Sequence, residues 1–221
     1  MSPDLPSTIA GRVVHEIVIK KSRFIATLVP VRSIGEADVE IAALRKQYWD
    51  ARHNCTALIV GTNAEQQRSS DDGEPSGTAG VPMLEVLRHR DLTDLVAVVT
   101  RYFGGVLLGA GGLVRAYSGV VTEALDRARL VRRELLTEVT VDVPHADAGR
   151  LDNWLRDWAT GHDSVWEAPS WTAVARFQLF VPPIALPALA DDLAAFTAGA
   201  VVPVVGASRV VDVPESSTAP Q

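Results

Sequence analysis

Glycine is concentrated in one stretch of this chain, residues 101–117, which reads RYFGGVLLGAGGLVRAY. The glycines are Gly104, Gly105, Gly109, Gly111 and Gly112, with the arginines Arg101 and Arg115 on either side. Glycine lets the backbone take positive φ and lets a ligand come close. The stretch follows an apolar run and leads into a helical pattern, and free N–H groups and the helix dipole at a helix start favour an anion. We therefore predict a phosphate or carboxylate site built from these seven residues.

Known phosphate-loop fingerprints do not fit this stretch. No Gly-Lys-Ser/Thr follows, so it is not a Walker A loop, and Val114 stands where a dinucleotide fingerprint needs a small residue. The same glycines could instead serve only tight turns and close helix–sheet packing. Spacing alone leaves both interpretations open.

An acidic segment, DDGEPSGTAG, occupies residues 71–80. Its carboxylates, Asp71, Asp72 and Glu74, could bind a divalent cation through oxygen or supply a general base. Asp-Gly and Glu-Pro are also common in solvated turns, and EF-hand spacing is missing. We favour the turn and predict no metal site.

A third segment, DARHNC, places His53 two residues before Cys55. Such a pair could be a base with its nucleophile, or two metal ligands. Cys55 begins an apolar run, however, and a buried cysteine usually packs as a small hydrophobic residue. His53 is the stronger candidate for a site residue. We assign no catalytic residue and no cofactor.

Hydrophobic periodicity predicts the elements that position these segments. In the first part we expect strands at residues 13–19, 24–31, 55–60 and 95–100, helices at 35–49, 82–90 and 110–130, and a long loop at 63–80. In the second part we expect strands at 136–143, 165–166, 172–181 and 201–205 and helices at 146–158 and 186–196. The order of the second part, β-α-β-β-α-β, is the ferredoxin-like pattern. The prediction is an α+β protein with domains at 10–135 and 136–213 and a disordered tail at 214–221.

Charge and cysteine content narrow the functional classes. Residues 1–138 hold 17 basic and 17 acidic side chains, whereas residues 139–221 hold 4 and 10 and so carry the whole net charge of −6. Any contact with nucleic acid must therefore come from a local patch in the first part. The single cysteine excludes an internal disulfide. With no signal-peptide pattern and no apolar run of about 18 residues, we expect a cytoplasmic protein without a membrane partner.

Four segments together, KKSRFIA near the start and then the three segments above, resemble the Impact/YigZ family in sequence and in order. The resemblance covers residues 10–130, and the second part is similar only in pattern to a domain of bacterial members. It implies a first domain like domain 2 of ribosomal protein S5 and a second like a C-terminal domain of elongation factor G. The resemblance also implies a link to translation. Eukaryotic Impact proteins moderate translation under stress and use an extra N-terminal domain that this chain lacks, while the bacterial members supply no activity to carry over. The motif residues shared with the family beyond the glycine-rich stretch are His53, Cys55, Asp71, Asp72, Gly73, Glu74, Pro75, Gly77, Thr78 and Gly80.

Three functional hypotheses follow. The favoured one is a non-enzymatic regulator of translation that binds RNA, the ribosome or a translation-associated protein. The second is an enzyme acting on a phosphorylated small molecule or nucleotide, with the acidic segment holding Mg²⁺. The third is a protein–protein adaptor that uses the acidic second part. The favoured hypothesis depends on the regions of His53, Glu74 and Gly111 converging in one pocket.

Overall fold

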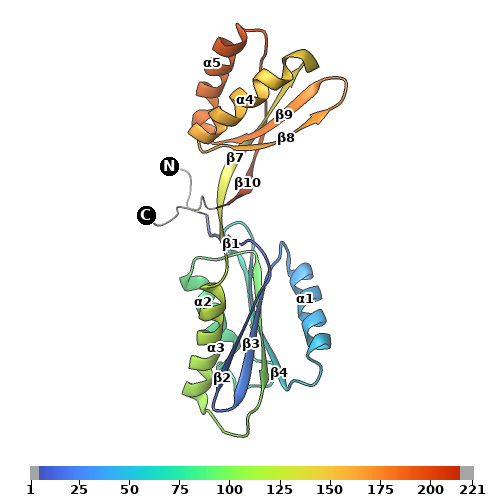
Figure 1. Ribbon diagram of the computed structural model, residues 1–221. Coiled ribbons are helices and arrows are strands. Elements are labelled where there is room, and N and C mark those ends of the chain that lie inside the picture. Colours follow the sequence, from blue (N-terminus) through green and yellow to red (C-terminus); the bar gives the residue numbers. More distant parts are fainter. Residues whose placement is uncertain (1–4, 215–221) are drawn as a thin grey trace, which may run out of the picture. The chain divides into compact units, whose positions relative to one another are not determined.

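The computed structural model describes residues 5–214, and these divide between Arg132 and Arg133 into two compact units (Figure 1). Helices and antiparallel sheets occur in both, so the fold is α+β as predicted. The predicted boundaries at residues 135 and 136 stay a prediction, and residues 215–221 of the predicted tail lie outside the described residues. Within the described range, no helix combines the length and apolar character needed to cross a bilayer.

The first unit is built on a five-stranded antiparallel sheet in the order β2-β3-β6-β4-β5. Helix α1 covers one face and helices α2 and α3 cover the other (Figure 1). The elements are β1 (Thr8–Ile9), β2 (Val13–Ile19), β3 (Ser22–Pro30), α1 (Ile34–Gln47), β4 (His53–Val60), β5 (Gln66–Ser70), α2 (Gly80–His89), β6 (Leu95–Tyr102) and α3 (Ala110–Leu125). β1 pairs with the first residues of β7 (Leu130–Val143).

Two separate apolar cores explain why the central strands lack hydrophobic alternation. On β6, Ala97 and Val99 pack beneath α2 and α3, whereas Val96 and Val98 pack beneath α1. A strand covered on both faces is apolar at every position. This confirms the prediction of a doubly covered strand at residues 95–100.

The predicted loop at residues 63–80 is wrong in its first half, because it contains β5. This strand pairs with β4 along its length, from Thr56 opposite Ser70 to Val60 opposite Gln66. It lies at the sheet edge with mostly exposed polar side chains. Backbone hydrogen bonds hold such a strand, so it leaves no hydrophobic pattern in the sequence.

The second unit has the predicted order of strands and helices, with a short 3₁₀ turn before its last helix. Its sheet runs in the order β10-β7-β9-β8. Its further elements are α4 (His145–Gly161), β8 (Val165–Trp171), β9 (Ala175–Val181), α5 (Leu186–Thr197) and β10 (Val204–Pro214). One apolar core packs both helices against the sheet, with Phe177 and Leu155 fully buried in it.

Three predicted boundaries differ clearly from the structure. β8 continues to Trp171 rather than ending at residue 166, because it pairs with β9. Helix α3 ends at Leu125 rather than at residue 130, because Leu130 and Val131 pair with β1 and start β7 six residues before the predicted strand. β10 begins at Val204 and continues well past the predicted end at residue 205. These boundaries are set by backbone hydrogen bonds between strands, and such bonds leave no trace in the spacing of apolar residues.

Candidate functional site

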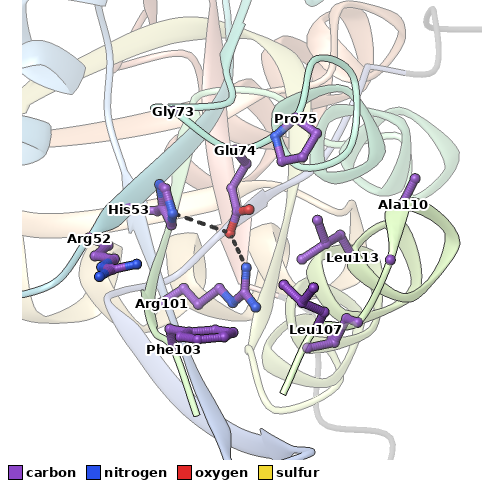
Figure 2. Close-up of a pocket in the computed structure, with 12 residues that line it drawn as sticks. Arg52, His53, Gly73, Glu74, Pro75, Arg101, Phe103, Leu107, Ala110 and Leu113 are labelled. Carbon is purple, nitrogen blue, oxygen red and sulfur yellow. Dashed lines mark hydrogen bonds and ion pairs between the residues drawn. The ribbon is translucent and has the colours of Figure 1, made fainter. Parts of the chain in front are cut away.

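A pocket of about 430 Å³ opens in the first unit, where segments far apart in the sequence meet (Figure 2). The start of β4, the loop after β5, the end of β6, the loop after β6 and the first residue of α3 all contribute to it. Its lining residues are Arg52, His53, Gly73, Glu74, Pro75, Arg101, Phe103, Leu107, Leu108, Gly109, Ala110 and Leu113. The three motif segments therefore share one cavity.

A buried carboxylate, that of Glu74, lies at the centre of the polar contacts. Arg101 Nη1 donates to Glu74 Oε1 at 2.6 Å, and the hydroxyl of Tyr117 donates to the same oxygen at 2.7 Å. The side chains of Arg101 and Glu74 are only 7% and 3% exposed. Burial, followed by its acidic neighbours, raises the pKa of Tyr117, so the phenol stays protonated and donates. Glu74 and Arg101 form an ion pair without net charge. The pair therefore shapes the pocket but gives it no net charge.

His53 faces the same carboxylate from the other side (Figure 2). Its Nδ1 donates to the backbone carbonyl of Asp72 at 2.9 Å, which orients the ring and leaves Nε2 as the nitrogen that faces the pocket. That Nε2 lies 3.9 Å from Glu74 Oε1, too far for a hydrogen bond. Gly73 beside the ring has a φ of +86°, a conformation that glycine adopts without strain. Nε2 is thus available to bond a ligand.

The acidic loop owes its shape to Asp71. Its carboxylate accepts backbone N–H bonds from Gly77, Ala79 and Gly80 at 2.8–3.0 Å, at the start of α2. Burial alone would raise the pKa of Asp71, but these three donors outweigh it and hold that pKa below its ordinary value. Gly77 has a φ of +74°, a conformation that glycine adopts without strain.

The acidic residues do not converge on one point. Asp72 accepts from Arg45 Nη2 at 2.9 Å and from the backbone N–H of Asn54 at 2.7 Å, while Glu74 faces Arg101. Across residues 5–214, no group of three or more metal-binding side chains comes together. The loop therefore acts as a folded turn that aims Glu74 into the pocket.

Cys55 lies beneath the pocket and is fully buried. Its thiol donates to the carbonyl of Asp71 at 3.0 Å and lies 3.4 Å from the hydroxyl of Tyr117. Burial raises the pKa of Cys55 to about 12. A thiol that stays protonated at neutral pH is neither a nucleophile nor a metal ligand, so the structure supports its packing role.

The glycine-rich stretch performs two different tasks. Gly104 passes against the β2–β3 turn so closely that a Cβ would lie 2.0 Å from the carbonyl carbon of Lys21. Gly109, with a φ of +73°, precedes the first residue of α3, Ala110, and both line the pocket. The first N–H groups of a helix have no partner within the helix, so α3 presents donors at this end.

Of the predicted anion-binding residues, Arg101 and Gly109 line the pocket. The others are adjacent in the loop or in α3 but do not line it: Gly104, Gly105, Gly111, Gly112 and Arg115. Of the predicted motif residues, His53, Gly73, Glu74 and Pro75 line it, whereas Cys55, Asp71, Asp72, Gly77, Thr78 and Gly80 support it from behind or build the adjoining loop. The assignment of these residues to an anion stays a prediction.

Sequence reasoning missed several lining residues and one contact. The missed residues are Arg52, Phe103, Leu107, Leu108, Ala110 and Leu113. The contact is that of Tyr117, which lies in the helix predicted at residues 110–130 and whose hydroxyl bonds Glu74. The apolar members make the pocket amphipathic, so it suits a ligand with an apolar body as well as a charge.

Comparison with known proteins places these segments in context. Residues 20–125 match the profile of the Impact N-terminal domain. The chain is 52% identical over 143 residues to the IMPACT family member YvyE of Bacillus subtilis, covering 65% of this chain and 66% of that protein. It is 44% identical over 139 residues to an IMPACT family member in the pol 5′ region of Thermus thermophilus, covering 63% of this chain and 74% of that protein.

A solved structure described as that of a hypothetical protein aligns along nearly the whole chain. It has a TM-score of 0.60 and 32% identity, and the alignment covers 98% of this chain and 100% of that one. By sequence, the match to the Bacillus subtilis relative spans just under two thirds of that relative's length, at 66%.

Proposed function

This chain belongs to the IMPACT family, and from that premise we propose that it regulates translation without catalysing a reaction. In this proposal the protein works in the cytoplasm and binds RNA, the ribosome or a ribosome-associated factor. The observation that carries it is the pocket, in which Arg52 and the start of α3 offer positive potential beside an already neutralised Glu74–Arg101 pair. Phosphate groups are the anions that all ribosomal RNA surfaces share.

The same proposal includes the finer fold assignment. The first domain, residues 10–135, would be like domain 2 of ribosomal protein S5. The second, residues 136–213, would be ferredoxin-like, which its element order and its sheet order β10-β7-β9-β8 support. A fold does not establish an activity, so the function rests on the pocket.

Cosedimentation with ribosomes tests the proposal. The protein should pellet with ribosomes at low salt and be released as salt rises, because phosphate contacts weaken steeply with ionic strength. The double variant Arg52→Gln/Arg115→Gln should be released at lower salt. The matched control is Arg127→Gln/Arg129→Gln, two exposed arginines at the other end of α3. A protein that stays in the supernatant at low salt, with all ribosomal fractions, would refute the proposal.

One feature favours an enzyme as the second candidate: the ring of His53 is held through Nδ1, and its Nε2 faces the pocket. A histidine held in this way can act as a general base on a phosphorylated small molecule or nucleotide. A thermal-shift screen with nucleotides and sugar phosphates tests it, since a ligand of the native state raises apparent stability. Absence of any shift at millimolar concentrations would eliminate this candidate.

A further inference from the structure

The pocket end of the first unit carries four exposed basic side chains that have no acidic partner among the described residues. They are Lys20, Lys21, Arg52 and Arg115. Elsewhere in this unit most arginines are paired, as Arg12 is with Glu40. Exposed cations that lack acidic partners in an otherwise neutral unit create a local positive potential.

These four side chains belong to segments that meet at the pocket. Arg52 lines it. Lys20 and Lys21 form the β2–β3 turn, which touches the loop after β6 at Gly104. Arg115 lies in the second turn of α3, with its guanidinium near Gly111. Figure 1 shows this turn, this loop and the start of α3 at the same end of the unit.

The three carboxylates Asp50, Asp71 and Glu16 near this end do not cancel the positive charge of these side chains. Asp50 accepts a bond from the hydroxyl of Tyr102 at 2.8 Å, and Asp71 accepts from backbone N–H groups. These neutral donors leave both negative charges in place, but two negative charges offset only half of the four positive ones. Glu16 pairs with Arg23 on β2 and β3. The four cations therefore outnumber the carboxylates that could neutralise them at this end of the unit.

We call the four side chains Lys20, Lys21, Arg52 and Arg115 the basic rim. The pocket beside the basic rim has an aromatic wall. The ring of Phe103 is 41% exposed, and the guanidinium of Arg101 lies 5.7 Å from its centroid. Leu107, which is 82% exposed, lies across the pocket from it (Figure 2). An apolar slot beside an exposed ring suits a flat apolar group such as a nucleobase, which stacks on aromatic side chains.

A buried donor at the floor of the pocket also lacks an acceptor. Arg101 is 5% exposed, and its Nε has no hydrogen-bond partner within residues 5–214, although Nη1 bonds Glu74. A buried N–H without an acceptor is unfavourable, because it has lost its bonds to water and gained none in return. A ligand that brings an acceptor to this floor, with a slight movement of the flanking Phe103, removes that cost.

We propose that the pocket end binds single-stranded RNA, with one unpaired base in the slot beside Phe103. The flanking phosphodiesters contact Arg52, the N-terminus of α3, Arg115 and the Lys20–Lys21 turn. A paired base cannot enter the slot, so duplex RNA is excluded. The proposal deepens the function proposed above and depends on it for the choice of RNA over other phosphate polymers.

Fluorescence anisotropy with a labelled, unstructured ten-nucleotide RNA tests the proposal, with the same sequence as a duplex for comparison. The single strand should bind more tightly than the duplex. Four phosphate contacts predict a slope of log K against log salt of about −3, at roughly −0.7 for each contact. Lys20→Gln/Lys21→Gln should reduce that slope by about 1.4, while Arg127→Gln/Arg129→Gln should leave it unchanged.

Phe103 provides the more specific test. Phe103→Leu keeps an apolar side chain but loses the flat ring, and it should weaken binding roughly 5- to 150-fold, as removal of a stacking platform does. Phe103→Tyr keeps the ring and should bind like the parent protein. Circular dichroism of each variant establishes that it is folded.

Two results would overturn the proposal: equal affinity for duplex and single strand, or unchanged affinity in Phe103→Leu. If the protein sediments with ribosomes but binds no single-stranded RNA, this inference fails while the proposed function stands with a protein partner. If an acidic peptide binds with this dependence on Lys20 and Lys21 while the single-stranded RNA does not bind, the surface belongs to a protein partner and the proposal is overturned. If neither ribosomes nor RNA are bound, both proposals fail.

Discussion

Replacing Glu74 by glutamine removes the charge that faces Arg101 while keeping the size of the side chain. In the native protein Arg101 Nη1 lies 2.6 Å from Glu74 Oε1, and both side chains are more than nine-tenths buried. Breaking a buried pair leaves the other charge uncompensated, which costs about 3–5 kcal/mol. Glutamine can still accept from Arg101 and from Tyr117, so we expect about 3 kcal/mol, at the low end of that range.

Hydrogen exchange followed by mass spectrometry measures this loss within the first unit. Amides of β6 and α3 should exchange on the order of 100-fold faster in Glu74→Gln, since about 1.4 kcal/mol corresponds to a factor of ten. Amides of β9 in the second unit have their own core and provide an internal control. Their exchange should not change.

The double variant Glu74→Gln/Arg101→Met distinguishes charge balance from general disruption. Removing both charges leaves no uncompensated ion, so the double variant should be more stable than the sum of the two single losses predicts. If Glu74→Gln changes exchange less than about 5-fold, or if the two losses simply add, the reasoning about a charge-balanced pair is refuted.

Three further predictions follow from the support of the pocket. The thiol of Cys55, whose burial raises its pKa to about 12, should resist iodoacetamide at pH 8 in the native protein and react readily in urea, as mass spectrometry will show; fast native labelling would contradict it. The pKa of Asp71 is lower in the folded than in the unfolded protein, where it is about 3.9. Its contribution to stability is therefore complete above about pH 4 and is lost as pH falls through the folded value. Asp71→Asn should flatten the dependence of stability on pH below about pH 4, as urea unfolding at several pH values will measure. Gly104→Ala should destabilise the first unit, because its Cβ would lie 2.0 Å from the backbone of Lys21. Gly119→Ala in α3 has open space around it and should be neutral or stabilising by up to about 1 kcal/mol. Equal melting temperatures of the two variants would refute this contrast.

Apolar spacing was enough to predict the α+β fold, the doubly covered β6 and the order of elements in the second unit. Each of these depends on which side chains are buried, and burial leaves a periodic signal. β5 could not be predicted in this way, because it is an exposed edge strand held through the backbone of β4. The early end of α3 could not be predicted for the same reason, because Leu130 and Val131 leave the helix to pair with β1.

The candidate site was predictable in its segments but not in its contacts. The sequence marked Glu74 as acidic and Arg101 as basic, yet their pairing depends on how the turn held by Asp71 aims Glu74 into the pocket. Tyr117 has the helical spacing of a core residue, and only the fold shows that its hydroxyl reaches Glu74. Phe103 lies within the glycine-rich stretch, but its exposure follows from the path of the loop after β6.

The balance of charge in the pocket also determines which residues can attract an anion. Because Arg101 is matched by Glu74 at 2.6 Å, its guanidinium adds shape and one unsatisfied Nε–H donor but little long-range potential. Attraction over distance must therefore come from the exposed rim, at Lys20, Lys21, Arg52 and Arg115. Charge removal at the rim should change the association rate and its salt dependence, while changes at Phe103 should act on dissociation. Stopped-flow mixing with the ten-nucleotide RNA separates the two effects, and a rim variant that altered only the dissociation rate would contradict this division of roles.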